Sequence, residues 1–182
     1  NLAPHIDHLL DKSGKQWRAD HYLWCAGAWT GQLLPQNTVA KTSNGIDSST
    51  IKPIKGQMLL FKQPLNWMPT IAMHQDCYIV PRQDGHILVG ASLEDIGFDK
   101  IPTQAVKQTL LQKLSSLAPD LATQPVLKQW AGLRPYANPD NIPYIGQIPQ
   151  YSNAWINAGH YRYGLLLAPY SAAQIAQLIN NA

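Results

Sequence analysis

Two arginines, Arg134 and Arg162, stand in apolar sequence flanked by glycine. Only four of the 14 basic residues are arginine, so arginine is not the general solubilising charge of this chain. A guanidinium stays ionised and presents a planar fork of donors that matches a carboxylate, and burying it without a partner is costly. No acidic residue lies between Asp120 and Asp140, and none follows Asp140. A bound anionic ligand is therefore one candidate partner for these two cations.

The other reactive side chains form no pattern that is typical of a metal site or a catalytic set. The six histidines and two cysteines form no closely spaced set of the kind that binds zinc, and Glu94 is the single glutamate beside ten aspartates. We predict no metal site. No Ser/His/Asp or Cys/His arrangement has a recognisable context, so no residue is assigned a general-base role. Cys25 and Cys77 are expected to be reduced, buried thiols of a cytoplasmic protein.

Length and composition narrow the class of protein. The 182 residues, of which 45% are hydrophobic, suffice for one large domain or two small ones with a real core. The net charge of +3 is spread without a basic cluster, so nucleic-acid binding is not expected. No apolar run approaches the roughly 18–20 residues of a membrane span. The chain opens at Asn1 without a signal peptide and reads as part of a longer protein.

The elements that must position the arginines include one strand–turn–helix over residues 20–35. A short apolar run there is followed by Gly27 and small residues, and Pro35 ends the helix. Such a turn lets backbone N–H groups approach a cofactor, although ordinary strand-to-helix turns favour glycine as well. Residues 36–50 are polar and are expected to form a loop.

Further strands are predicted from apolar runs and turn residues. Two hairpins are expected, one over 5–19 around Ser13-Gly14 and one over 77–90 around Asp84-Gly85. Single strands are expected over 51–61, 126–133 and 155–158, the second leading into Arg134. The run Leu165 to Pro169 is expected to be a strand or turn.

Two helices are expected. Thr103 to Leu117 carries an apolar stripe, with Thr103 as the cap and Pro119 beyond its end. Ser171 is expected to cap a last helix that has Ile175, Leu178 and Ile179 on one face. Strands and helices are mixed without regular βαβ repetition, which indicates an α+β class or a mixed arrangement of two domains.

Seven segments of the chain resemble segments of a known protein family. They are residues 19–29, 53–58, 77–82, 90–92, 130–135, 143–146 and 158–169, including Ala-Gly-Leu-Arg-Pro and Ala-Gly-His-Tyr-Arg-Tyr-Gly. In order and spacing they resemble the C-terminal half of the FAD-dependent D-amino-acid oxidase superfamily, most closely its bacterial glycine-oxidase branch, which serves thiamine biosynthesis. The GxGxxG fingerprint of that family is absent from this chain.

The resemblance implies a domain division. Residues 1–55 and 140–182 would belong to a Rossmann-like FAD-binding domain that lacks its N-terminal part. Residues 56–139 would form the substrate domain, an antiparallel mixed sheet with flanking helices. FAD is implied as the cofactor of the intact protein, and this chain alone is not expected to hold it.

The resemblance also assigns the substrate side. It implies oxidative deamination of glycine or a small amino acid by hydride transfer to flavin, with dioxygen as oxidant and hydrogen peroxide as product. Arg134 matches the arginine that binds the substrate carboxylate, and Tyr78 matches a tyrosine that assists there. Arg162 matches an arginine near the flavin. The plainer alternatives are a structural arginine bonded to carbonyl groups at 134 and a strand-edge tyrosine at 78.

On the cofactor side the resemblance implies seven contacts with the flavin. Of these, His160 is expected to position rather than act as a base. The residues are Gly27, Ala28, Gly159, His160, Tyr161, Gly164 and Leu165. Gln57 and Met58 are interpreted as structural or supporting residues.

Two positions bear on the substrate. Tyr163 stands where the family commonly has a small polar residue, which puts the size of the substrate in doubt, and Leu93 lies where a pocket wall is implied. Alternatives to the oxidase are a sarcosine- or D-amino-acid-dehydrogenase type of enzyme, a folded fragment that binds no flavin, and an ordinary α+β binding protein. A homo-oligomer is a further expectation.

Overall fold

The computed structural model describes residues 3–34, 49–64, 67, 69–74 and 76–182. The chain divides into two compact units. Unit 1 comprises residues 1–53 and 134–182, and unit 2 comprises residues 54–133. The two boundaries fall inside strands β4 (Ile51–Lys62) and β8 (Lys128–Ala137). Most of the loop predicted over residues 36–50 lies outside the described residues.

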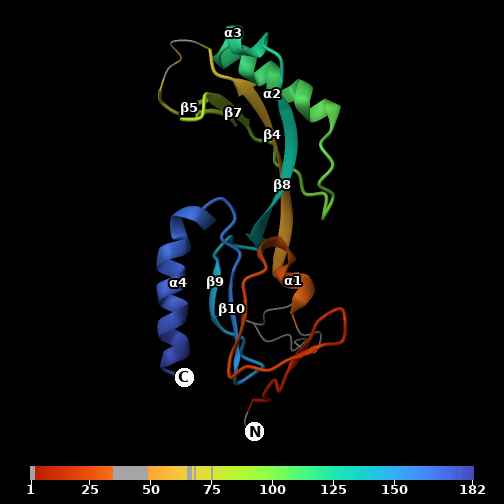
Figure 1. Cartoon of the computed structure of the whole chain (residues 1–182), viewed down its shortest axis with the longest axis vertical. Helices are drawn as coiled ribbons and strands as arrows, with labels where there is room; N and C mark the ends of the chain where they lie inside the picture. Colours follow the sequence, from red (N-terminus) through yellow and green to blue (C-terminus); the bar gives the residue numbers. More distant parts are fainter. Residues whose placement is uncertain (1–2, 35–48, 65–66, 68, 75) are drawn as a thin grey trace. The chain divides into compact units, whose positions relative to one another are not determined.

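Unit 1 is built around a three-stranded sheet with the order β3-β10-β9 (Figure 1). Its strands are β3 (Tyr22–Trp24), β9 (Tyr144–Gln147) and β10 (Ala154–Ala158). Strand β10 runs parallel to β3 and antiparallel to β9. The predicted strand–turn–helix is confirmed, because β3 leads into a 3₁₀ turn (Gly27–Trp29) and α1 (Thr30–Leu33).

The first hairpin is confirmed in a shortened form. Strands β1 (Leu9–Leu10) and β2 (Gln16–Trp17) pair antiparallel, and Gly14 between them has a φ of 84°. Asp11 fixes the turn by accepting hydrogen bonds from Ser13 and Lys15 backbone N–H groups. Hydrogen bonds from the Ser13 hydroxyl and the Trp17 indole, together with these backbone bonds, lower the pKa of Asp11 to about 2.

The last helix differs from the prediction. Helix α4 (Gly164–Asn180) begins seven residues before Ser171 and contains Pro169, so the run Leu165 to Pro169 is helical rather than a strand or turn. Packing of this helix against β9 and β10 outweighs the cost of a proline inside it. Ser171 is not a cap: it is buried inside the helix and donates to the carbonyl of Ala168 at 3.3 Å. Helix α4 packs along β9 and β10 (Figure 1).

The core of unit 1 follows the pleat of its strands. Tyr22 and Trp24 of β3 and the alternate residues of β10 point to the same interior. The indole N–H of Trp24 donates to the carbonyl of Leu33 at 2.8 Å, which attaches α1 to the sheet. The buried cluster consists of Tyr22, Trp24, Leu34, Ile51, Ala137, Ile148, Ala154, Ile156 and Ala158.

Unit 2 contains most of a five-stranded sheet with the order β5-β6-β7-β4-β8. It includes β5 (Ala72–His74), β6 (Cys77–Pro81) and β7 (His86–Gly90). The hairpin predicted around Asp84-Gly85 is confirmed, with β6 antiparallel to β7 and Gly85 at a φ of 79°. The strand expected over 126–133 begins later and continues through Arg134 to Ala137.

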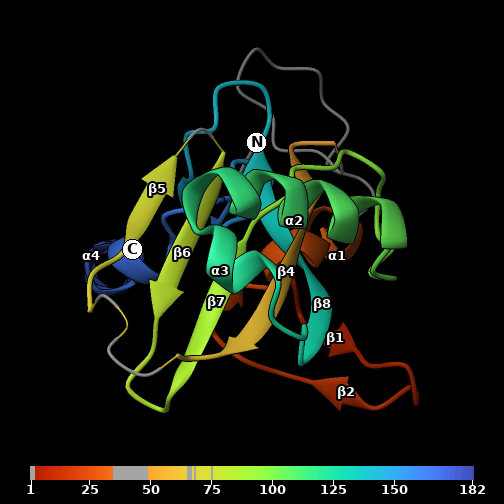
Figure 2. The ribbon, with the colours of Figure 1, turned by 90° about the horizontal axis from the view of Figure 1, so that it is seen from above.

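Helices α2 (Gln104–Leu117) and α3 (Pro119–Ala122) lie over one face of this sheet (Figure 2). The predicted cap is confirmed, since the Thr103 side chain accepts a hydrogen bond from the N–H of Val106. The buried cluster beneath the helices consists of Leu59, Phe61, Cys77, Ile79, Ile87, Val89, Leu110, Leu114 and Leu121. The expected α+β class is confirmed.

The two cysteines are both free, but only Cys77 is buried. Cys25 is exposed, which corrects the expectation of a buried thiol: it follows the last residue of β3, where the chain leaves the sheet. Desolvation raises the pKa of both thiols. Among the helices of the described residues, none combines the length and apolar character needed to cross a membrane.

Candidate functional site

The carboxyl ends of β3 and β10 lie at one edge of the unit 1 sheet. The two strands are parallel, with Trp24 opposite Ile156, so the segments that follow them leave the same edge. Ligands of open sheets bind at such an edge, outside the carboxyl ends of parallel strands. Gly27 and Gly159 begin the two departing segments with φ angles of 56° and 89°, which favour glycine.

Gly159 is a point of close approach. A Cβ at this position would lie 2.8 Å from both Ala137 Cβ and Ile51 Cδ1. The end of β10 therefore packs directly against the ends of β8 and β4 that belong to unit 1. Any side chain at 159 would push these three segments apart and would move the residues that follow.

The segment after Gly159 is joined to the segment after Arg134. The N–H of Tyr161 donates to the carbonyl of Pro135 at 2.8 Å, and Tyr136 forms an isolated bridge with His160. The rings of Tyr136 and Tyr161 meet edge to face, with centroids 5.3 Å apart. These contacts bring the half-buried Arg134 beside the predicted flavin segment, within unit 1.

The amino-terminal end of α4 lies directly after this segment. Within the described chain no side chain caps the helix, and its first turn holds no acidic residue. The first N–H groups of a helix lack intrahelical partners, and the helix dipole makes this end partly positive. Arg162 and Leu165 are exposed at this end. The arrangement suits a ligand that carries hydrogen-bond acceptors.

His160 has an unused polar atom. Its Nε2 is buried and finds no hydrogen-bond partner among the described residues. Burial lowers the pKa of the imidazole, because desolvation disfavours the charged form. A buried polar atom without a partner is unfavourable, so a ligand that meets Nε2 would be stabilised by this position.

In unit 2, Tyr78 lies in a row that crosses three strands. Gly90 of β7 is the register partner of both Tyr78 on β6 and Met58 on β4. Over this glycine the hydroxyl of Tyr78 donates a hydrogen bond to the sulfur of Met58 at 3.3 Å. Tyr78 and Met58 are both partly exposed.

A buried polar network that the sequence did not reveal supports the segment after β7. Gln57 Nε2 donates to the Glu94 carboxylate at 3.0 Å, while Gln57 Oε1 accepts from the N–H of Thr103 at 2.8 Å. Ser92 accepts from the N–H of Gln57 at 2.9 Å and donates to Glu94. The network holds the segment that carries Leu93, whose side chain is exposed.

Two signals could have pointed to this network. Glu94 is the only glutamate of the chain, and Lys55 and Gln57 are polar residues in a strand that is rich in apolar ones. Lys55 is fully buried and lies 3.4 Å from Asp99 and 4.0 Å from Glu94. Asp99 and Glu94 are therefore both held by contacts with Lys55 of strand β4.

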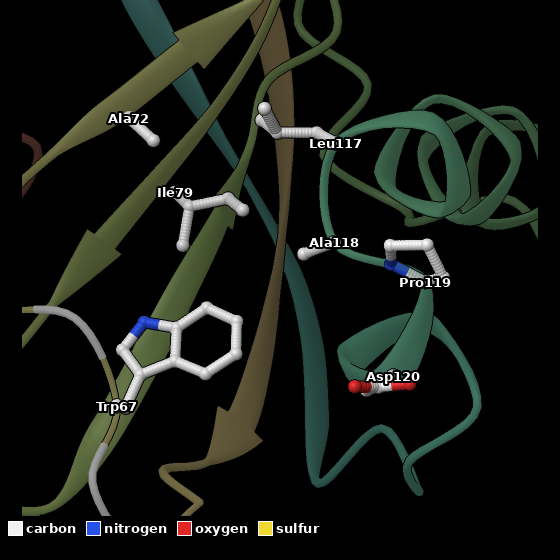
Figure 3. A pocket seen from close by; sticks show the side chains of 7 residues that line it. All are labelled: Trp67, Ala72, Ile79, Leu117, Ala118, Pro119 and Asp120. Atoms are coloured by element: carbon white, nitrogen blue, oxygen red, sulfur yellow. The ribbon is translucent and has the colours of Figure 1, made fainter.

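Unit 2 also contains an apolar cavity of about 190 Å³ that holds none of the predicted site residues. Figure 3 shows Trp67 and Ile79 on one side of it and Ala118 and Pro119 on the other. Ile79 points to the face under α2 and α3, whereas its neighbour Tyr78 points to the opposite face. The cavity is therefore separate from the row that contains Tyr78.

The predicted site residues fall in both units. Tyr78 is in unit 2, and all the others are in unit 1. Within unit 1 the structure brings together the segments after Arg134 and after Gly159, and it places Gly27 and the buried Ala28 at the same sheet edge. The unit 1 residues are Gly27, Ala28, Arg134, Gly159, His160, Tyr161, Arg162, Gly164 and Leu165.

Comparison with known proteins gives a consistent result. Residues 4–178 match the family described as FAD dependent oxidoreductase. The chain is 42% identical over 163 residues to the glycine oxidase of Pseudomonas aeruginosa, covering 90% of this chain and 42% of that protein. It is 40% identical over 166 residues to the bifunctional protein ThiO/ThiG of Nostoc sp., covering 89% of this chain and 23% of that protein.

The fold agrees with these matches. The crystal structure of glycine oxidase from Geobacillus kaustophilus superposes with a TM-score of 0.81 and 26% identity, covering 98% of this chain and 48% of that one. The chain thus spans less than half the length of these relatives. Because the family match extends over nearly the whole sequence, this chain belongs to the FAD-dependent oxidoreductase family.

Proposed function

We propose that this chain is the C-terminal part of an FAD-dependent amino-acid oxidase that acts on glycine or another small amino acid. The observation that carries the proposal is the pairing of two segments in unit 1. The hydrogen bond from Tyr161 N–H to Pro135 and the Tyr136–His160 bridge put the proposed carboxylate anchor, Arg134, beside the proposed flavin segment. An enzyme that oxidises the α-carbon of an amino acid needs those two functions side by side.

The residues at the sheet edge fit a flavin. His160 Nε2 is buried without a described partner, and among the described residues no side chain caps the amino terminus of α4. When bound, the flavin would supply the redox chemistry, as acceptor of a hydride from the substrate and donor of electrons to dioxygen. In this proposal Gly27, Ala28 and residues 159–165 hold and orient it.

Arg134 would bind the substrate carboxylate. Its guanidinium presents two parallel donors to the two carboxylate oxygens, which fixes both the position and the rotation of the substrate. The Tyr78 hydroxyl would donate a further hydrogen bond to the same carboxylate, and Arg162 would add positive charge near the flavin. None of these residues needs to abstract a proton, in keeping with the absence of an assigned general base.

The domain roles belong to the same proposal. Residues 56–139 would form the substrate domain, and residues 1–55 and 140–182 would be part of the FAD-binding domain. The compact units divide at 53/54 and 133/134, so Arg134 lies in unit 1. The apolar side chain of Leu93 would form a wall that suits a small substrate, and the ring of Tyr163 would limit its size. A cytoplasmic location and a homo-oligomeric state belong to this proposal as well.

Substitution of Arg134 in the flavin-loaded full-length protein tests the proposal. Arg134→Ala should raise the KM for glycine about 100-fold or more and leave the flavin content unchanged, because a buried charge-assisted pair is lost. Arg82→Ala is the control, since Arg82 is an exposed arginine that pairs with Asp84 at 2.7 Å. An unchanged KM in Arg134→Ala would contradict the role of Arg134 in binding the substrate carboxylate.

Two further measurements separate the alternatives. Production of hydrogen peroxide by the full-length protein distinguishes an oxidase from a dehydrogenase that passes electrons to a carrier. Flavin absorbance of the isolated 182-residue chain distinguishes a chain that holds the cofactor from one that requires the rest of the nucleotide domain. We expect peroxide in the first measurement and a colourless chain in the second.

A further inference from the structure

The row Met58–Gly90–Tyr78 contains a sulfur atom whose role is not explained by packing alone. Neighbouring strands lie about 4.8 Å apart, so side chains on β4 and β6 would ordinarily be separated by the residue on β7 between them. Because that residue is Gly90, Met58 and Tyr78 reach over it and touch. A Cβ at Gly90 would overlap the Met58 sulfur and would lie 3.1 Å from the Tyr78 hydroxyl.

The acceptor in this contact is weak. A thioether sulfur accepts hydrogen bonds poorly, whereas a carboxylate accepts them strongly. A hydroxyl has a single proton to donate, so Tyr78 can serve either Met58 or a substrate carboxylate. With a thioether as its resting partner, the hydroxyl is released at little cost when a carboxylate arrives.

We propose that Met58 is a site of oxidation by hydrogen peroxide, and that its sulfoxide reduces substrate affinity by retaining the Tyr78 hydroxyl. The reaction is balanced. A sulfur lone pair attacks one oxygen of the peroxide, the S–O bond forms as the O–O bond breaks, and water leaves after proton transfer. Sulfur is oxidised by two electrons and the peroxide is reduced to water.

The consequence rests on the proposed function, which makes peroxide the product and Tyr78 a ligand of the substrate. Met58 is partly exposed, so this residue is open to an oxidant as small as hydrogen peroxide. The sulfoxide is neutral overall, but its oxygen carries a partial negative charge and replaces a weak acceptor with a stronger one beside the Tyr78 hydroxyl, which already contacts the sulfur at 3.3 Å. Hydrogen peroxide that accumulates as product would thus raise the KM for the substrate by oxidising Met58, the residue beside Tyr78.

The first arm of the test needs no enzymatic activity. The full chain is treated with hydrogen peroxide, and peptide mass spectrometry follows addition of one oxygen at Met58. Tyrosine NMR, with Tyr78→Phe for assignment, should show a shift of Tyr78 that follows Met58 oxidation. Met73, which is exposed on β5, serves as the internal reference for oxidation. Because Met73 is the register partner of Tyr78, the NMR spectra are recorded on Met73→Leu, in which its oxidation cannot shift Tyr78. Oxidation of Met73 without Met58, or of Met58 without a Tyr78 shift, would overturn the proposal.

The second arm uses the flavin-loaded full-length protein. Peroxide treatment should raise the KM for glycine roughly tenfold to a hundredfold, about the loss of one hydrogen bond to a charged group. Methionine sulfoxide reductases should reverse the change. Met58→Leu should show no peroxide effect relative to its own untreated value, whereas Met73→Leu should keep it. A KM rise that persists in Met58→Leu would contradict the proposal.

The two arms distinguish the possible failures. If the full-length protein does not oxidise amino acids, the proposed function fails, while the mass and NMR measurements still decide whether Met58 oxidation captures Tyr78. If glycine is oxidised but KM is insensitive to Met58 oxidation, the proposed function stands and this inference fails.

Discussion

The ammonium group of Lys55 donates a hydrogen bond of 2.6 Å to the carbonyl oxygen of Ile101. This bond joins a fully buried residue of β4 to the segment that leads into α2. Asp99, at 3.4 Å, supplies a countercharge, and a hydrogen bond from the Ile101 N–H lowers the pKa of Asp99. The bond therefore fixes the segment in front of the helix as well as compensating a buried charge.

We expect Lys55→Met to destabilise the chain by about 2–4 kcal/mol, because the Ile101 carbonyl and the Glu94 network lose a buried partner. Urea denaturation measures the free energy of unfolding. Lys62→Met is the control, since Lys62 lies on the same strand and is exposed. Equal loss of stability in the two variants would contradict the role given to Lys55.

Gly159→Ala should destabilise the chain by about 2–4 kcal/mol, because it combines overpacking with a positive φ. Gly146→Ala is the matched control: Gly146 is on β9 of the same unit, and a Cβ there meets no atom within 4 Å. Thermal denaturation compares the two. In the full-length protein Gly159→Ala should also lower the flavin content, and a fully loaded, stable variant would refute this expectation.

The state of His160 gives a pH dependence. Burial lowers its pKa below 6.5, so the unfolded chain binds a proton more readily than the folded chain. The free energy of unfolding should therefore fall as the pH decreases from about 6.5 through the lowered pKa, and this contribution should be constant below it.

Urea denaturation between about pH 5 and pH 8 tests this in the range where His titrates. His160→Asn should show a weaker pH dependence than the unmodified chain. His74→Asn, at an exposed position on β5, should leave the dependence unchanged. Parallel pH profiles for the unmodified chain and His160→Asn would show that His160 does not contribute.

Arg134→Lys should be nearly as poor as Arg134→Ala in the full-length enzyme. A single ammonium cannot reproduce the two parallel donors of a guanidinium, so KM should rise by about tenfold or more. Arg82→Lys controls for the exchange itself, because Arg82 is exposed and donates through both Nε and Nη2 to Asp84. Steady-state kinetics with glycine measures this KM. If Arg134→Lys kept the KM of the unmodified enzyme, the expectation would be contradicted.

Elements with local signals were predictable from the sequence. The hairpin around Asp84-Gly85 and the helix after Thr103 depend on turn and cap residues a few positions apart, and both are confirmed. The start of α4 was not predictable, because Ser171 resembles a cap and Pro169 resembles a break. The helix nevertheless begins at Gly164, because it packs against β9 and β10.

The candidate site shows the same difference between local signals, which the sequence reveals, and contacts between distant segments, which it does not reveal. Arg134 and Gly159 were singled out from their sequence context, but the pairing of their segments depends on Pro135 and Tyr161, which are 26 positions apart in the printed sequence. The network around Glu94 likewise joins residues of β4 to residues far along the chain. Contacts between distant segments leave no periodic pattern for sequence reasoning to detect.

The close approach at Gly90 has an evolutionary consequence. Since the Met58 sulfur occupies the volume that a side chain at 90 would need, substitutions at the two positions should show epistasis. A larger residue at 90 should be tolerated only after a smaller one appears at 58. Any lineage that takes this route loses the thioether contact of Tyr78, so the order in which the two mutations arise constrains how this part of the sheet can diversify.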